Sequence, residues 1–233
     1  MPGTLEDQRV ADFMTGITQL FCSKQFSDVT IRLGEVELPA HRFVLSTQSE
    51  YFKRALAGKF EEGQTGIFQY RDGSMHAYWR CFKYIYTGEY SEEPAAELSM
   101  PDDDELSKDV RVYDLAQYFQ IQGLQQYALE KFQPKVERLW VSERFVDCIR
   151  DVYASTVNKD CKMRQMVVNV THNHLDDLWD KVFEDLLREG GDFVVDLMAQ
   201  IKPQKGRRRG RAAVAIAAAP AKPQTTLAIR YSE

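Results

Sequence analysis

The sequence has few cysteines and no long apolar run, and each shortage excludes a class of protein. Four cysteines in 233 residues are too few for a disulfide-stapled scaffold, and none form a C-x-x-C pair, so we expect no zinc site. The longest run of small apolar residues, Ala212 to Ala219, is far shorter than the roughly 20 residues of a membrane-spanning helix. The start, MPGTLEDQRV, lacks an apolar segment behind basic residues, so we expect no signal peptide, and a cytoplasmic or nuclear location.

Composition and charge indicate a globular body with a separate basic tail. At 44% hydrophobic and 28% charged residues, the chain has enough apolar material for a core, which excludes a wholly disordered regulator. Residues 202–233 contain eight basic residues and one acidic residue. The other 201 residues therefore carry 30 − 8 = 22 basic and 35 − 1 = 34 acidic groups, a net charge of −12.

The first 133 residues combine helical and strand patterns. Spacing of the apolar residues predicts helices over 10–21, 42–48, 50–57, 75–87, 112–119 and 124–132, and strands over 29–33, 36–38 and 67–70. Ser74 is a candidate N-cap for the fourth of these helices. The segment 91–107 holds two prolines and an acidic run, and it is predicted to be a solvated loop.

The rest of the chain shows only helical periodicity and then none. Helices are predicted over 145–153, 163–170, 175–187 and 193–201, with 175–187 the longest amphipathic helix of the chain. Pro134 is the expected boundary before this part, and the segment after Pro203 cannot bury enough surface to become ordered. We therefore expect an α+β module over 1–133, an all-α module over 134–201 and a disordered basic tail over 202–233.

Four short segments, in this order, carry a resemblance to a known family. They are Phe26-Ser27-Asp28-Val29-Thr30-Ile31, Leu38-Pro39-Ala40-His41-Arg42-Phe43-Val44-Leu45-Ser46, Ser49-Glu50-Tyr51-Phe52 and Tyr84-Ile85-Tyr86-Thr87-Gly88. Over residues 10–133 the chain resembles a BTB/POZ domain. Its sequence in this region is most similar to the BTB proteins of filamentous fungi. Residues 134–201 are more loosely similar to the helical, BACK-like extension that follows many BTB domains.

The resemblance implies a protein-interaction domain that forms a homodimer through its N-terminal helix. The expected interface consists of Phe13, Met14, Ile17, Leu20 and Phe21. These side chains offer more apolar surface than a short terminal helix normally exposes, and such a patch usually marks an interface. The alternative is that this helix simply packs on its own domain.

Asp28 and His41 are the most obvious catalytic candidates, as a carboxylate that orients an imidazole. No nucleophile accompanies them in a recognisable motif, and the resemblance implies that both are structural residues of the BTB domain. The chain also lacks a G-x-S-x-G motif and a phosphate-binding glycine loop. We therefore expect neither an enzyme nor a cofactor.

The densest set of possible metal ligands is His172, His174, Asp176 and Asp177. An extended segment would bring both imidazoles to one side, as a metal site requires. We favour a second interpretation, in which a helix begins at residue 173 or 174 and the two aspartates occupy its first turn, where the helix dipole favours anions. No metal is expected.

Phe60 and Glu62 match a hydrophobic-x-Glu motif. In BTB adaptors of cullin-3 ubiquitin ligases this motif follows the helix that carries the residue matching Phe52, so the resemblance implies cullin-3 as a partner. Such adaptors continue into a helical pair, which residues 135–155 would supply. The alternative is a solvated loop whose phenylalanine folds back. No kelch repeat, MATH domain or zinc-finger array is present, so the sequence names no protein substrate.

The tail favours a rival class of function. Its basic cluster consists of Lys205, Arg207, Arg208, Arg209 and Arg211. Such clusters act as nuclear-import signals or contact nucleic acid, but no aromatic residue is interleaved to stack on bases, so nucleic acid is not the expected partner. The leading interpretation is a dimeric adaptor for a cullin-3 ligase. The alternatives are a nuclear or transcription-associated scaffold and a bare dimerisation module.

Overall fold

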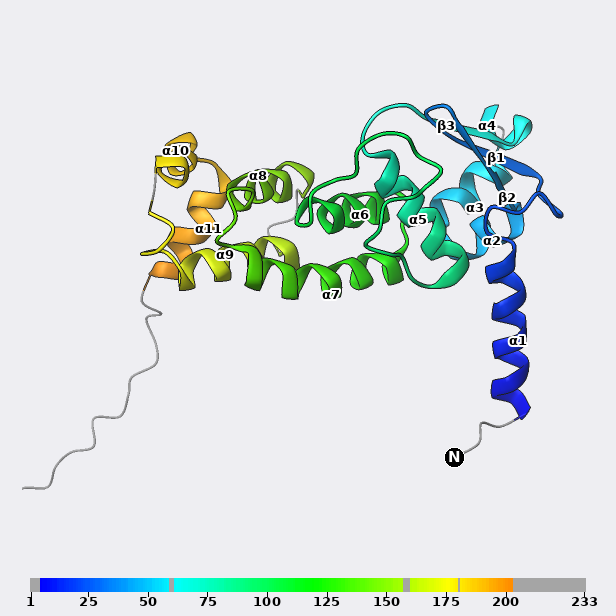
Figure 1. Cartoon of the computed structure of the whole chain (residues 1–233), viewed down its shortest axis with the longest axis horizontal. Coiled ribbons are helices and arrows are strands. Elements are labelled where there is room, and N and C mark those ends of the chain that lie inside the picture. The colour runs from blue at the N-terminus through cyan, green and yellow to red at the C-terminus, as the bar shows by residue number, and fades with distance from the viewer. Residues whose placement is uncertain (1–4, 59–60, 157–159, 180, 203–233) are drawn as a thin grey trace, which may run out of the picture. The chain divides into compact units, whose positions relative to one another are not determined.

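A computed structural model of the chain describes residues 5–58, 61–156, 160–179 and 181–202 (Figure 1). Phe60 and the basic cluster at 205–211 lie outside the described residues, as does nearly all of the predicted disordered tail. The described helices and strands belong to one compact unit that ends at Ile201. A small sheet with many helices confirms the predicted fold class.

The sheet has three strands, β1 (Val29–Leu33), β2 (Val36–Ala40) and β3 (Ile67–Tyr70), in the order β2-β1-β3. The antiparallel pair β1–β2 closes at Gly34, whose φ of 59° suits glycine. The pair β1–β3 is parallel. Because strand residues alternate between the two faces, Val29, Ile31 and Leu33 all enter the core, as their spacing predicts.

Seven helices are described in the first part of the chain. They are α1 (Leu5–Gln19), α2 (Arg42–Gln48), α3 (Glu50–Ala57), α4 (Glu61–Thr65), α5 (Met75–Thr87), α6 (Ser107–Tyr118) and α7 (Gln122–Leu139). Ser74 caps α5 as predicted, its hydroxyl accepting the amide hydrogen of Ala77. Ser49 caps α3 in the same way through the amide of Phe52. α4 was not predicted, because five residues are too few to display helical periodicity.

The loop between α5 and α6 is not the freely solvated segment that the sequence predicts. Tyr90, Leu98 and Leu106 are buried, and Asp102 accepts two hydrogen bonds, of 2.8 and 2.7 Å, from the buried guanidinium of Arg80. Within the acidic run, Asp102 supplies the carboxylate that the buried Arg80 needs, while Asp103 and Glu105 pair with the more exposed Arg111 and Arg138. Composition alone cannot show such pairing, since the partners lie on other elements.

The second part contains α8 (Phe145–Ser155), α9 (Lys162–Asn173), α10 (Lys181–Glu189) and α11 (Asp192–Ile201). α7 runs through Pro134, so the expected boundary falls inside a helix rather than in a linker. The exposed ring of Pro134 lies on the solvent side, and buried Phe132 and Val136 continue one core across it. The division at residue 133 stays a prediction.

The long helix predicted over 175–187 is wrong. α9 ends at Asn173, the amide of His174 donates to the carbonyls of Val170 and Thr171, and turns occupy 174–178 before α10 begins at 181. The His174 ring stacks on Trp140 with centroids 3.8 Å apart. The apolar period persists through the break because the half-buried Leu175 and Leu178 of the turn also face the core. The two aspartates therefore do not open a helix.

Candidate functional site

Helix α1 carries an exposed apolar face. No residue of α1 is buried, and Phe13 and Met14 are 60% and 43% exposed. Figure 1 shows the helix, in blue, projecting from α5 and the sheet with its N-terminal half away from both. Exposed side chains of this size gain free energy when a partner covers them.

The other predicted interface residues lie at or just after the C-terminal end of α1. Phe21 packs edge-on against Trp79 of α5, with ring centroids 5.4 Å apart, and lies 5.7 Å from Tyr86. Ile17 and Leu20 are also half-buried against the core. The structure therefore divides the predicted set into an exposed pair and three residues that attach α1 to its own domain.

Asp28 and His41 occupy neighbouring positions but do not bond to each other. The His41 ring nitrogens lie 2.9 Å from the Tyr86 hydroxyl and 2.8 Å from the carbonyl oxygen of Gln25. The Asp28 carboxylate accepts the amide hydrogen of Arg42 at 2.7 Å, at the start of α2. These bonds tie α2, α5 and the segment before β1 together.

Glu62 lies on α4, which follows the undescribed residues 59–60. Its side chain is exposed, whereas the next residue, Gly63, is pressed against the α3 backbone so closely that a Cβ there would lie 2.4 Å from the Ala55 oxygen. Arg42 donates to the Gly63 carbonyl at 3.0 Å. This packing fixes α4 while leaving the Glu62 carboxylate free to meet a partner.

Tyr51, which is half-buried, lies within electrostatic range of Glu62, and the exposed Tyr118 contacts Tyr51. The Tyr118 hydroxyl donates to that of Tyr51 at 3.3 Å, and the ring centroids are 5.0 Å apart. Partial burial, Tyr118 and the nearby Glu62 carboxylate together raise the pKa of Tyr51, which therefore stays neutral at physiological pH. The sequence analysis did not identify Tyr118. A signal was present, because Tyr118 lies outside the apolar face of α6 and is exposed, whereas the next residue, Phe119, is buried.

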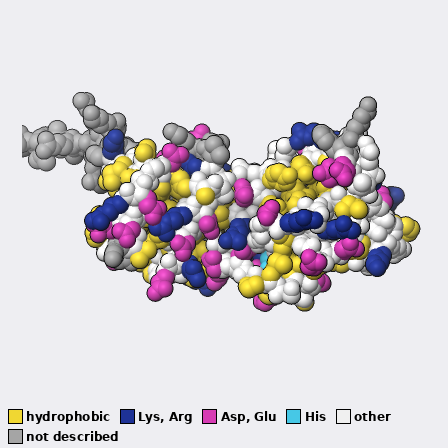
Figure 2. Space-filling model, turned by 90° about the horizontal axis from the view of Figure 1, so that it is seen from above, with side chains coloured by type: hydrophobic (Ala, Val, Ile, Leu, Met, Phe, Trp, Pro, Cys, Tyr) yellow, Lys and Arg dark blue, Asp and Glu magenta, His cyan; other side chains and the backbone are white. Residues whose placement is uncertain are grey.

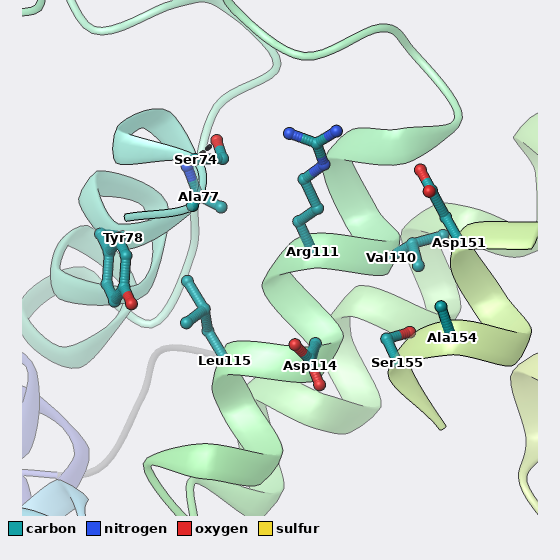
Figure 3. A pocket seen from close by; sticks show the side chains of 11 residues that line it. Ser74, Ala77, Tyr78, Val110, Arg111, Asp114, Leu115, Asp151, Ala154 and Ser155 are labelled. Carbon is teal, nitrogen blue, oxygen red and sulfur yellow. Dashed lines mark hydrogen bonds between the residues drawn. The ribbon is translucent and has the colours of Figure 1, made fainter. Parts of the chain in front are cut away.

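A groove of about 400 Å³ lies between α5, α6 and α8. Figure 3 shows Arg111 extending between Ser74 on α5 and Asp151 on α8, with Asp114 on the same helix as Arg111. Arg111 donates to Asp103 at 2.5 Å, and partial burial raises the pKa of Asp114. The Ser74 hydroxyl donates to the Asp103 carboxylate, and the Ser155 hydroxyl donates to the Val152 carbonyl oxygen.

The surface carries charges of both signs. Figure 2 shows acidic and basic side chains interspersed with hydrophobic ones on one face, without a continuous field of either sign. No described helix is both long enough and apolar enough to cross a membrane.

The comparisons with known proteins agree with this arrangement. The BTB/POZ domain family matches residues 17–135, about half of the chain. Kelch-like protein 30 of Mus musculus is 32% identical over 77 residues, which are 33% of this chain and 13% of that protein. Kelch-like protein 38 of the same species is 34% identical over 79 residues, 34% of this chain and 14% of that protein. Human BTB/POZ domain-containing protein 9 is 33% identical over 73 residues, 31% and 12% of the two chains.

The chain belongs to the BTB/POZ domain family, and that domain is a protein-interaction domain. The matched segments span only about 13% of the length of these curated relatives. The relatives therefore inform the BTB domain of this chain and leave residues 136–233 to be interpreted from their own structure.

Proposed function

We propose that this protein is a non-enzymatic, dimeric BTB adaptor that recruits a protein substrate to a cullin-3 ubiquitin ligase. The observation that carries the proposal is Glu62, which is exposed on α4 within electrostatic range of Tyr51 in a BTB domain. Phe60 stands two positions before Glu62 in the sequence. An aromatic anchor flanked by a carboxylate is ordinary interface chemistry. The tyrosine hydroxyls add hydrogen-bonding groups around it.

Dimer formation through α1 is part of the proposal. Phe13 and Met14 are exposed on a helix with no buried residue, which supports a second copy as the occupant of this face. Two BTB domains in one particle present two ligase-binding faces, and this increases avidity without any new contact.

The BACK-like extension is also a proposal. The C-terminal part of α7, where the BTB/POZ match ends at residue 135, continues through the turn at 140–144 into α8. Helical structure on both sides of this turn supports residues 135–155 as the helical pair that cullin-binding adaptors carry. The described helices that follow offer surface for a substrate.

The direct experiment is a calorimetric titration of the full chain into the N-terminal region of a cullin-3. We expect the wild type to bind, and Phe60→Asp to weaken binding by at least tenfold, about 1.4 kcal/mol. Glu62→Lys should weaken it too, because the carboxylate is exposed and available to a partner.

Val195→Asp, which places the same charge on an exposed aliphatic position of α11, is the matched control and should bind like the wild type. Absence of binding by folded wild-type protein would remove the ligase assignment. Equal losses in Phe60→Asp and Val195→Asp would show that the motif has no special part.

The basic cluster at 205–211 favours a second candidate, a nuclear BTB scaffold that dimerises and recruits partners. Five basic residues within seven positions are a typical import signal. This candidate shares the dimer with the first and differs in needing neither Phe60 nor Glu62.

A further inference from the structure

A second groove, of about 610 Å³, opens between the turn that follows α7 and the start of α10. It lies in the part of the chain that the BTB/POZ match does not cover. We refer to it as the α10 groove. Its lining side chains come from three places in the sequence: the turn at 140–143, the first residues of α8, and residues 177, 178, 182 and 183.

The floor of the α10 groove is apolar and rigid. Phe145 and Phe183 are buried beneath it, and Trp140 is held by its stack on His174. A concave surface with fixed aromatic side chains loses little entropy when a ligand covers it, because few rotamers remain to be fixed.

The walls expose aliphatic side chains that the fold leaves uncovered. Val141 is 69% exposed and Val182 is 51% exposed, and both line the groove. Trp179, also largely exposed, lies beside it, with its ring centroid 6.4 Å from that of Phe183. Single exposed valines need no explanation, but two that face one concave site next to a tryptophan form a continuous apolar surface.

Among the described side chains that line the groove, the charged ones are acidic. They are Glu143 and Asp177, and the His174 ring lies 4.0 Å from the Asp177 carboxylate. Residues 1–201 carry a net charge of −12, which favours a basic partner for the body as a whole. A partner that brings positive charge to this site is attracted over a long range and oriented at the rim.

We propose that the α10 groove binds an amphipathic helical segment of a partner protein. The segment places its apolar face on Val141, Val182 and the aromatic floor, and its lysine or arginine side chains beside Glu143 and Asp177. In its biological role this rests on the proposed adaptor function, since the bound segment then belongs to the recruited substrate. Binding itself is independent of cullin-3.

The test uses the full chain and two fluorescent peptides of about 16 residues, long enough to form a helix when bound. One peptide alternates leucine and lysine at helical spacing, and the other has glutamate in place of every lysine. We expect fluorescence polarisation to show binding of the lysine peptide alone. Val141→Asn and Val182→Asn should each weaken it about tenfold, because a buried amide without a partner opposes docking.

Val195→Asn is the matched control, since Val195 is 62% exposed on α11 and does not line the groove. It should change the affinity less than twofold. Similar losses in all three variants, equal binding of both peptides, or binding of neither would overturn the proposal.

Two further measurements separate other occupants and the ligase assignment. In the first, Arg207, Arg208 and Arg209 are all changed to Ser. Tighter peptide binding by this variant would assign the groove to the chain's own basic segment and contradict the proposal that a partner protein occupies it. A reduced mass of Val141→Asn in light scattering would assign it to a second copy. Val182 lies on α10, outside the α7–α8 pair, so Val182→Asn should leave the cullin-3 titration unchanged. Failure of the groove and failure of the ligase assignment therefore give different results.

Discussion

Lys135 joins two carboxylates across the loop that follows α5. Its ammonium donates to Glu92 at 2.6 Å and to the fully buried Asp109 at 2.7 Å, and the Tyr90 hydroxyl donates to Asp109 at 2.7 Å. Burial raises the pKa of Asp109, and the Lys135 ammonium opposes that shift. Removal of Lys135 would leave a buried carboxylate without a cation, which costs about 3–5 kcal/mol in comparable sites.

Glu92 makes the stability of this loop depend on pH. Partial burial raises its pKa, but hydrogen bonds from Lys131 and Lys135 outweigh burial and lower the pKa to about 2. A lowered folded-state pKa stabilises the fold above the ordinary value of 4.5, and that contribution is lost as the pH falls toward about 2. We expect Glu92→Gln to cost about 1 kcal/mol or less at pH 7, since the carboxylate remains partly exposed.

The measurement is urea unfolding of both proteins at pH 7 and pH 3.5. The difference between them should shrink at the lower pH. Glu93→Gln is the control, because Glu93 pairs with no basic side chain in the described part of the chain. A Glu92→Gln deficit that stays constant with pH would contradict the ion-pair explanation.

At the scale of the element, α1 shows that one apolar stripe serves two purposes. Phe21 lies against Trp79 and Tyr86, whereas Phe13 and Met14, about two turns earlier, are exposed. A substitution at Leu20 or Phe21 therefore disturbs the domain as well as any interface. The exposed pair tests association alone.

We expect Phe13→Asp combined with Met14→Asp to halve the mass seen by light scattering, because two charges cannot be buried at an apolar interface without partners. The unfolding midpoint of the resulting monomer should lose only its dependence on protein concentration. Val195→Asp should keep the dimer mass. A wild type that is already monomeric, or a double variant that keeps the dimer mass, would refute dimerisation through α1.

At the scale of the whole molecule, charge divides an acidic body from a basic tail. Residues 1–201 have a net charge of −12, and eight basic residues follow them. This charge distribution affects the localisation and association of the protein more than its fold. The candidate nuclear scaffold depends on that division.

If the cluster is an import signal, changing Arg207, Arg208 and Arg209 to Ser should abolish nuclear accumulation of a fluorescent fusion of the full chain. The control changes Arg9, Lys24 and Lys162 to Ser. These three positions are exposed, and the substitutions remove the same amount of charge from the body. Equal distribution of the two variants and the wild type would discard the import signal. Equal loss in both variants would assign the effect to net charge.

The sequence by itself determined the strands, most helices and their caps, because these depend on residues close together in the chain. The alternation of Val29, Ile31 and Leu33 fixes their burial, and the Ser74 hydroxyl caps α5 as predicted. The structure adds Ser49 as the cap of α3, which the sequence analysis did not predict. The BTB resemblance was readable for the same reason, since its motifs are short and local.

Only the tertiary structure decided which apolar and charged residues find partners within the fold and which remain exposed. The acidic loop is anchored because Arg80 and Lys135 reach it from other helices, and the predicted helix over 175–187 breaks where His174 stacks on Trp140. The α10 groove likewise combines the turn at 140–143 with residues 177, 178, 182 and 183. Contacts between segments that are distant in the sequence depend on how the helices pack. Local periodicity cannot reveal them, because an apolar helix face has the same spacing whether it packs on its own core or binds a partner.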